Sequence, residues 1–176
     1  MTLREDADTP GDAAPRPHDN CYWLLPGRLL AGEYPAPHLQ RLIDAGVTRF
    51  VDLTAPRDRL TDYAAALPSG ASRQSLPITD FGVPSVALMR EILAAIDSAL
   101  AANQRVYLHC HGGIGRTGTV AGCWLVEQGL SADEALALIA RKWQVMAKRS
   151  YAPHSPETAQ QREFIARWSS VKSNVG

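Results

Sequence analysis

A cysteine and an arginine lie six positions apart in the segment "VYLHCHGGIGRTGTV", residues 106–120. They are Cys110 and Arg116, and the five residues between them include three glycines. A thiolate is a strong nucleophile, and a planar guanidinium pairs with two oxygens of one phosphate. Glycines allow successive backbone N–H groups to turn toward one point and form an anion-binding nest. This spacing predicts a thiol nucleophile beneath a phosphate-binding loop.

The same glycines also fit a second pattern, because Gly113, Gly115 and Gly118 match G-x-G-x-x-G. A dinucleotide-binding turn requires a further strand after its helix and an acidic ribose partner about 20 residues on. Here the acidic residues that follow fall within helical patterns, and no strand follows. A nucleotide P-loop also fails, since the Lys-Ser/Thr pair is missing. The phosphate-binding interpretation is therefore favoured.

Short apolar or β-rich runs at 27–34, 48–54, 73–79 and 105–110 predict strands, and helical patterns at 36–46 and 84–104 lie among them. After Cys110 only helices are predicted, at 117–130, 131–143 and 155–168. Ser131 with Glu134 forms a capping box, and Ser155 followed by Pro156 predicts the last helix start. We expect one α/β domain with a central, mostly parallel sheet of about four to five strands flanked by helices. The loop after the last strand lies at the carboxyl edge, where such sheets bind ligands.

The domain is expected to span residues 20–170, between a flexible tail at 1–19 and a flexible C-terminus at 171–176. The chain carries 18 basic and 18 acidic residues and no net charge, so nucleic acid and membrane surfaces are not expected partners. No segment is apolar enough to span a membrane or to serve as a signal peptide. Three cysteines without paired spacing suit a reducing compartment, and we expect a cytoplasmic protein.

The segment "HCHGGIGRTG" resembles H-C-x5-R-[ST], the active-site loop of cysteine-dependent protein tyrosine and dual-specificity phosphatases. The segment "LPITDFGVP" is similar to the general-acid segment of the smaller dual-specificity members, and "SPETAQQREFIARW" resembles a C-terminal helix of bacterial ones. The resemblance covers residues 21–168 and implies a phosphatase that needs no cofactor. Its nucleophile would be Cys110, which forms a phosphocysteine intermediate. The phosphate would be bound by the loop residues His111, Gly112, Gly113, Ile114, Gly115 and Arg116.

Asp80 is the predicted general acid. It lies 30 residues before Cys110, just after a predicted strand, on a loop that should reach the same sheet edge. A turn-forming role is the alternative, because its surroundings are rich in turn residues. Asp58 and Asp62 are second candidates that follow no strand directly.

Three further residues receive supporting roles from the resemblance. The Thr117 hydroxyl would help the Cys110 sulfur to leave, unless it only caps the helix. His109 would hydrogen-bond the loop without exchanging protons with the substrate. Gln161 would correspond to a water-positioning glutamine, or it is simply a polar residue on an exposed helix face. The His111 side chain faces either solvent or substrate.

Other reactive residues have ordinary explanations. No metal is expected, because the remaining cysteines and histidines show no ligand spacing; these are Cys21, Cys123, His18, His38 and His154. Cys123 lies in an apolar helix and fits the core, whereas Cys21 is either structural or a redox partner of Cys110. The side chains of Tyr63, Phe81 and Val83 line a pocket rim or serve packing.

The substrate is less constrained than the reaction. A minimal domain has a shallow cleft that would admit phosphotyrosine, phosphoserine and phosphothreonine in proteins alike. Inositol phosphates and phosphoinositides are the alternative substrates, and the absence of lysine between Cys110 and Arg116 disfavours them. A non-catalytic phosphoprotein-binding module would be expected to lack Cys110, Arg116 or Asp80, and all three are present. The oligomeric state is left open.

Overall fold

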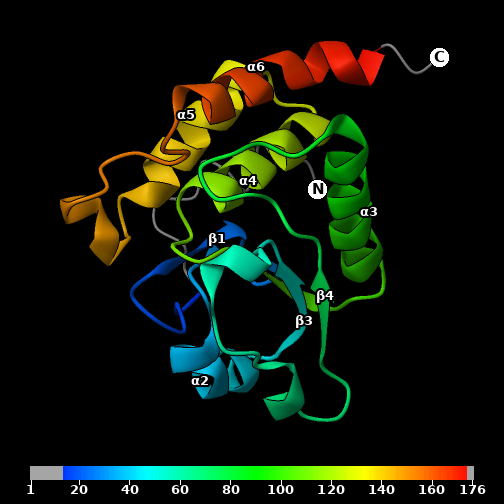
Figure 1. Ribbon diagram of the computed structural model, residues 1–176, viewed down its shortest axis with the longest axis vertical. Coiled ribbons are helices and arrows are strands. Elements are labelled where there is room, and N and C mark those ends of the chain that lie inside the picture. The colour runs from blue at the N-terminus through cyan, green and yellow to red at the C-terminus, as the bar shows by residue number, and fades with distance from the viewer. Residues whose placement is uncertain (1–13, 174–176) are drawn as a thin grey trace.

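The computed structural model describes residues 14–173, which form a five-stranded sheet with helices on both faces (Figure 1). The strand order is β1-β2-β5-β3-β4. Strands β1 and β2 pair antiparallel, and every other neighbouring pair is parallel. The strands are β1 (Cys21–Leu25), β2 (Leu29–Gly32), β3 (Val47–Asp52), β4 (Ser72–Ser75) and β5 (Arg105–His109). The expected single α/β domain with a mostly parallel sheet is confirmed.

Helix α2 covers one face of the sheet, and α3, α4 and α5 cover the other, with α6 packed on α4 and α5 (Figure 1). Successive side chains of β1 point alternately to the two faces of the sheet. Cys21 and Trp23 join the cluster on the α2 side, whereas Tyr22 and Leu24 join the larger core beneath the long helices. The helices are α2 (Leu39–Asp44), α3 (Val86–Ala101), α4 (Gly115–Glu127), α5 (Ala132–Trp143) and α6 (Ala159–Ser173). Of these, none is long and apolar enough to cross a membrane.

Helix α4 begins in the glycine-rich loop and is the central helix of the domain. Residues 115–126 are all buried, and α4 contacts α3, α5 and α6. Its glycines permit this packing, since a Cβ on Gly122 would lie only 2.3 Å from Cδ1 of Ile165 in α6. A helix buried all round is held by several layers of contact, which fixes the loop at its N-terminus.

The capping box predicted for α5 is confirmed. The Ser131 hydroxyl accepts from the Glu134 N–H at 3.2 Å, and the Glu134 carboxylate accepts from the Ser131 N–H at 2.8 Å. The predicted start of the last helix at Ser155 is wrong. Helix α6 begins at Ala159, directly after a capping box in which the Thr158 hydroxyl accepts the Gln161 N–H and Gln161 Oε1 accepts the Thr158 N–H, both at 3.1 Å.

The N-terminal boundary also differs from the expected one. His18 is only 4% exposed, and its Nε2 lies 3.1 Å from the Tyr107 hydroxyl, so residues assigned to the tail pack against the sheet. The Arg16 guanidinium donates to the Cys21 carbonyl at 3.0 Å. Residues 1–13 and 174–176 lie outside the described part of the chain.

Candidate active site

Cys110 follows the central strand β5 and is 2% exposed. Its Sγ accepts a hydrogen bond from the Gly113 N–H at 3.2 Å. Gly113 has a φ of +72°, and a Cβ at this position would lie 2.4 Å from the carbonyl carbon of Gly32 in β2. Glycine is therefore required where the loop turns back over the sulfur.

Three carbonyl groups of the loop are held by donors outside it. Tyr34 N bonds His111 O at 2.9 Å, Lys148 Nζ bonds Gly112 O at 2.9 Å, and Ser155 Oγ bonds Ile114 O at 2.7 Å. In a planar trans peptide the N–H points opposite to the C=O, so each anchored carbonyl turns the next N–H toward the inside of the loop. The N–H after the Gly112 carbonyl is the one that reaches the Cys110 sulfur. This arrangement offers peptide dipoles to an anion beside the thiol.

Arg116 lies in the first turn of α4, and its side chain is 1% exposed. Its Nη1 and Nη2 lie 2.8 Å and 3.0 Å from the two carboxylate oxygens of Asp58, and Nη1 also donates to the Ile78 carbonyl at 3.1 Å. Asp58 ends the 3-10 helix η2 (Pro56–Asp58), which follows β3. Asp58 therefore pairs with the arginine in a bidentate contact that its place in the sequence did not reveal.

Asp80 reaches the same guanidinium from a different loop. Its Oδ1 lies 3.0 Å from Arg116 Nη2, and its side chain is 48% exposed. Asp58 and Asp80, with Ala55, Arg57 and Thr79, line a cleft of about 560 Å³. The two aspartates meet because β3 and β4 are parallel neighbours whose carboxyl ends lie at one edge of the sheet.

Residues 18–165 match the family model described as "Swiss Army Knife protein, DSP-PTPase phosphatase domain". The chain belongs to this phosphatase family. The match includes the strand, the loop with Cys110 and Arg116, and the segment with Asp80.

Relatives agree with this assignment. The tyrosine-protein phosphatase cdc-14 of Caenorhabditis elegans is 26% identical over 172 residues, covering 86% of this chain and 22% of the relative. The crystal structure of Tk-PTP in the active form has a TM-score of 0.72 and 28% identity, covering 86% of this chain and 97% of the other. PTPMT1 in complex with PI(5)P shares the fold at 20% identity and a TM-score of 0.68, covering 84% and 93% of the two chains. The chain spans between about a fifth and half the length of the first curated relatives that it matches.

His109 is buried behind the loop of the phosphatase. Its Nε2 accepts from the Tyr63 hydroxyl at 2.7 Å, and its Nδ1 lies 3.1 Å from the Cys110 carbonyl oxygen. Burial lowers the pKa of His109, and the nearby Asp52 carboxylate offsets this only in part. A neutral ring protonated at Nδ1 satisfies both contacts, and it ties Tyr63 to the backbone at Cys110.

Thr117 follows Arg116 and is fully buried. Its hydroxyl has no hydrogen-bond partner within residues 14–173, so it does not cap the helix. A buried unpaired hydroxyl is costly, and this one adjoins the loop between Cys110 and Arg116. The His111 side chain, by contrast, is exposed.

Gln161 is not on an exposed helix face. It is fully buried, its Oε1 accepts from the Thr158 N–H at 3.1 Å, and its Nε2 donates to the Gly82 carbonyl at 3.2 Å. It therefore joins the start of α6 to the loop that carries Asp80. The carboxylate of Glu157 lies beside it, and burial followed by the charge of Asp80 raises the pKa of Glu157. Sequence reasoning missed Glu157, since no motif marks it.

The other two cysteines lie in the interior. Cys123 lies in α4 and is fully buried in the core. Cys21 lies in the cluster on the opposite face of the sheet from Cys110, its Sγ donates to the His18 carbonyl at 3.2 Å, and burial raises its pKa to about 11. These contacts favour a structural role for Cys21.

Among the suggested rim residues, Tyr63 is buried under His109, Phe81 is 60% exposed and Val83 is half-buried.

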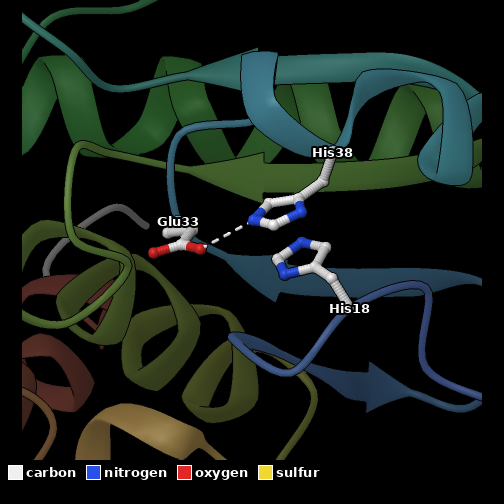
Figure 2. A group of neighbouring side chains, drawn as sticks. All are labelled: His18, Glu33 and His38. Carbon is white, nitrogen blue, oxygen red and sulfur yellow. Dashed lines mark hydrogen bonds and ion pairs between the residues drawn. The ribbon is translucent and has the colours of Figure 1, made fainter.

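Two histidines that are 20 residues apart in sequence meet near the back of the loop. Figure 2 shows the rings of His18 and His38 stacked beside the carboxylate of Glu33. Their potential ligand atoms lie within 4.8 Å of one another, and two histidines with a glutamate are a donor set that suits zinc. The sequence did not predict this cluster, because the three residues come from different segments.

Proposed function

We propose that this phosphatase hydrolyses phosphate monoesters of tyrosine, serine or threonine in proteins through a phosphocysteine intermediate. The observation that carries the proposal is the Cys110 sulfur, which accepts the Gly113 N–H inside a loop whose carbonyls are anchored outward. Donors aimed at the sulfur favour the thiolate, and the same donors suit the oxygens of a phosphate.

In the first step the Cys110 thiolate forms a bond to phosphorus while the bond to the leaving oxygen breaks. Asp80, which is half-exposed on the cleft, gives its proton to that oxygen. Arg116 holds two phosphate oxygens with its planar guanidinium. In the second step a water molecule attacks phosphorus, Asp80 takes the water proton, and the sulfur leaves with a hydrogen bond from the unpartnered hydroxyl of Thr117.

The test is hydrolysis of para-nitrophenyl phosphate in the presence of a metal chelator and a mild reductant. We expect turnover in the wild type and none in Cys110→Ser, which should still bind inorganic phosphate. Cys123→Ala is the matched control, because that thiol is buried in the core, and its activity should stay near that of the wild type. Equal turnover in Cys110→Ser and the wild type would refute the thiolate mechanism. Phosphate binding without any turnover in the folded wild type would favour a phosphoprotein-binding module.

Phosphoinositides are a second candidate, because Arg57 lines the cleft and makes no ion pair with a described residue. A free cation beside the reacting phosphate suits a substrate with a second phosphate. Phosphopeptides and soluble inositol polyphosphates should be compared for kcat/KM in the wild type and in Arg57→Met. We expect phosphopeptides to be preferred and Arg57→Met to leave them within about twofold, as for a rim charge. A selective loss with inositol polyphosphates would assign them as the substrate class.

A further inference from the structure

Of the three loop carbonyls described above, that of Gly112 accepts its hydrogen bond from a charged side chain. Its partner, Lys148, lies in the 3-10 helix η4 (Ala147–Ser150) between α5 and α6. The Lys148 side chain is 13% exposed and also forms a short ion pair with Glu33, which follows β2. A partly buried ammonium between a carboxylate and a carbonyl has little freedom to move.

Glu33 connects Lys148 to the rest of the cluster in Figure 2. One carboxylate oxygen lies 3.0 Å from His38 Nε2 and 3.3 Å from Asn20 Nδ2, and the other contacts Lys148. Burial alone would raise the pKa of Glu33, but Lys148 and the hydrogen bonds from His38 and Asn20 outweigh it and lower that pKa. Glu33 is therefore ionised at neutral pH, with both oxygens engaged.

The hydrogen atoms of this cluster argue against a resident metal ion. The Tyr107 hydroxyl donates to the Glu33 carbonyl at 2.6 Å, so it accepts from His18 Nε2–H at 3.1 Å. The other ring nitrogen of His18 accepts the Asn20 N–H at 3.3 Å. Neither nitrogen of His18 has a free lone pair for a cation, and the Lys148 ammonium already neutralises Glu33. The cluster works as a hydrogen-bonded support.

We propose that Glu33 and Lys148 are positioning residues of the phosphatase. Glu33 holds the Lys148 ammonium, which fixes the Gly112 carbonyl. The planar peptide then directs the Gly113 N–H at the Cys110 sulfur and at a bound phosphate. The inference rests on the proposed function, since it concerns the same phosphate site.

The fold does not need the ammonium to hold η4 in place. The Lys148 N–H donates to Asn20 Oδ1 at 3.1 Å, and the Ala147 N–H donates to the Asp19 carbonyl at 3.0 Å. These backbone contacts remain when the Lys148 side chain changes. A variant at Lys148 should therefore alter the loop more than the stability of the domain.

The test compares Lys148→Met, Lys148→Arg and Arg149→Met. Arg149 is the matched control, because it lies on the same 3-10 helix and its guanidinium donates to the exposed Gln144 side chain. We expect Lys148→Met to weaken inhibition by inorganic phosphate about tenfold, as for loss of one charge-assisted hydrogen bond. Lys148→Arg should restore most of the affinity, and Arg149→Met should match the wild type in both affinity and Tm.

Glu33→Gln tests whether the two residues act in series. Alone it should weaken phosphate inhibition by a few fold, and it should add nothing further in the Lys148→Met background. If the two changes acted independently, so that their fold-effects multiplied in the double variant, the proposal would be overturned. A phosphate inhibition constant in Lys148→Met within twofold of the wild type would also overturn it. Phosphate binding is also measured by calorimetry in the Cys110→Ser background. This binding measurement tests the inference even if the wild type shows no turnover. An absence of turnover would count against the proposed function alone.

Zinc titration tests the assignment of the hydrogen atoms. In the Cys110→Ser background, where the reactive thiol is absent, equimolar Zn²⁺ should leave the Tm unchanged. Stoichiometric Zn²⁺ binding that is lost in His38→Ala would overturn the proposal, because the cluster would then be a metal site.

Discussion

Two segments each bring a carboxylate to Arg116, and the two carboxylates, those of Asp58 and Asp80, are held very differently. The Asp58 side chain is 4% exposed and places both oxygens on the guanidinium, and one of these also accepts the Ala55 N–H at 2.6 Å. The Asp80 side chain is 48% exposed and has one contact with Arg116, at 3.0 Å. Asp58 is a fixed partner of the arginine, whereas Asp80 has an exchangeable contact.

From this difference we predict separate roles for the two aspartates. Burial alone would raise the pKa of Asp58, but the Arg116 guanidinium and the Ala55 N–H outweigh it and lower that pKa. An ionised Asp58 has no proton to donate, so we expect it to position the guanidinium. We expect an arriving phosphate to replace Asp80 on Arg116 and to leave Asp58 in place. The third candidate, Asp62, pairs with Arg73 at 2.9 Å instead.

The largest effect is expected at Asp80, and it should depend on the leaving group of the substrate. Asp80→Asn should lower kcat about 10² to 10⁴-fold on phosphopeptides, the range for loss of a general acid. The loss should be much smaller on aryl phosphates with a good leaving group, because these need less protonation. Single-turnover rates across a series of leaving-group pKa values measure this. An equal loss on every substrate would move the acid to another residue.

Asp58→Asn should give the opposite pattern. It leaves a buried guanidinium with weaker support, so phosphate affinity and kcat/KM should fall about tenfold or more for good and poor leaving groups alike, and the Tm should drop. Asp62→Asn is the matched control, since an exposed ion pair contributes little. If Asp58→Asn acted only on poor leaving groups, the two aspartates would have to exchange roles.

A smaller effect is expected where α6 supports the Asp80 loop. Gln161→Ala removes the hydrogen bond to the Gly82 carbonyl, and kcat on phosphopeptides should fall a few fold. Inhibition by inorganic phosphate should remain unchanged, because Arg116 is not touched. Glu163→Ala, at an exposed position of the same helix, serves as the control. A change in phosphate inhibition would place Gln161 in the binding site instead.

The last effect is on the stability of the domain and not on the reaction, and it concerns His18. Burial lowers the pKa of His18 from 6.5 to about 4, so the unfolded chain binds a proton that the folded protein does not. Stability should therefore fall as the pH drops from 6.5 to 4, by about 1–3 kcal/mol at most. Urea unfolding at several pH values measures this against His18→Gln, which should flatten the profile. An unchanged slope in that variant would show that His18 is not the titrating group.

The positions near Arg116 show how far sequence reasoning reached. The strand, the glycine loop and the helix with Arg116 were predicted because they are contiguous, and local turn geometry brings Cys110 and Arg116 together. The position of Asp80 at the same sheet edge was also predicted, because parallel neighbouring strands end at a common edge. Asp58 was placed among the candidates, but its bidentate contact with an arginine 58 positions away depends on tertiary packing.

The sequence by itself determined the α/β class, the glycine-rich loop between strand and helix, and the phosphatase resemblance, since short-range spacing carries each of them. Only the tertiary structure decided that Lys148 contacts both the Gly112 carbonyl and Glu33, that Gln161 is buried, and that α6 begins at Ala159. The physical reason is that these features depend on which distant group satisfies a polar atom. Ser155 resembles a helix cap in sequence, but its hydroxyl donates to the Ile114 carbonyl, 41 positions away, and Thr158 caps α6.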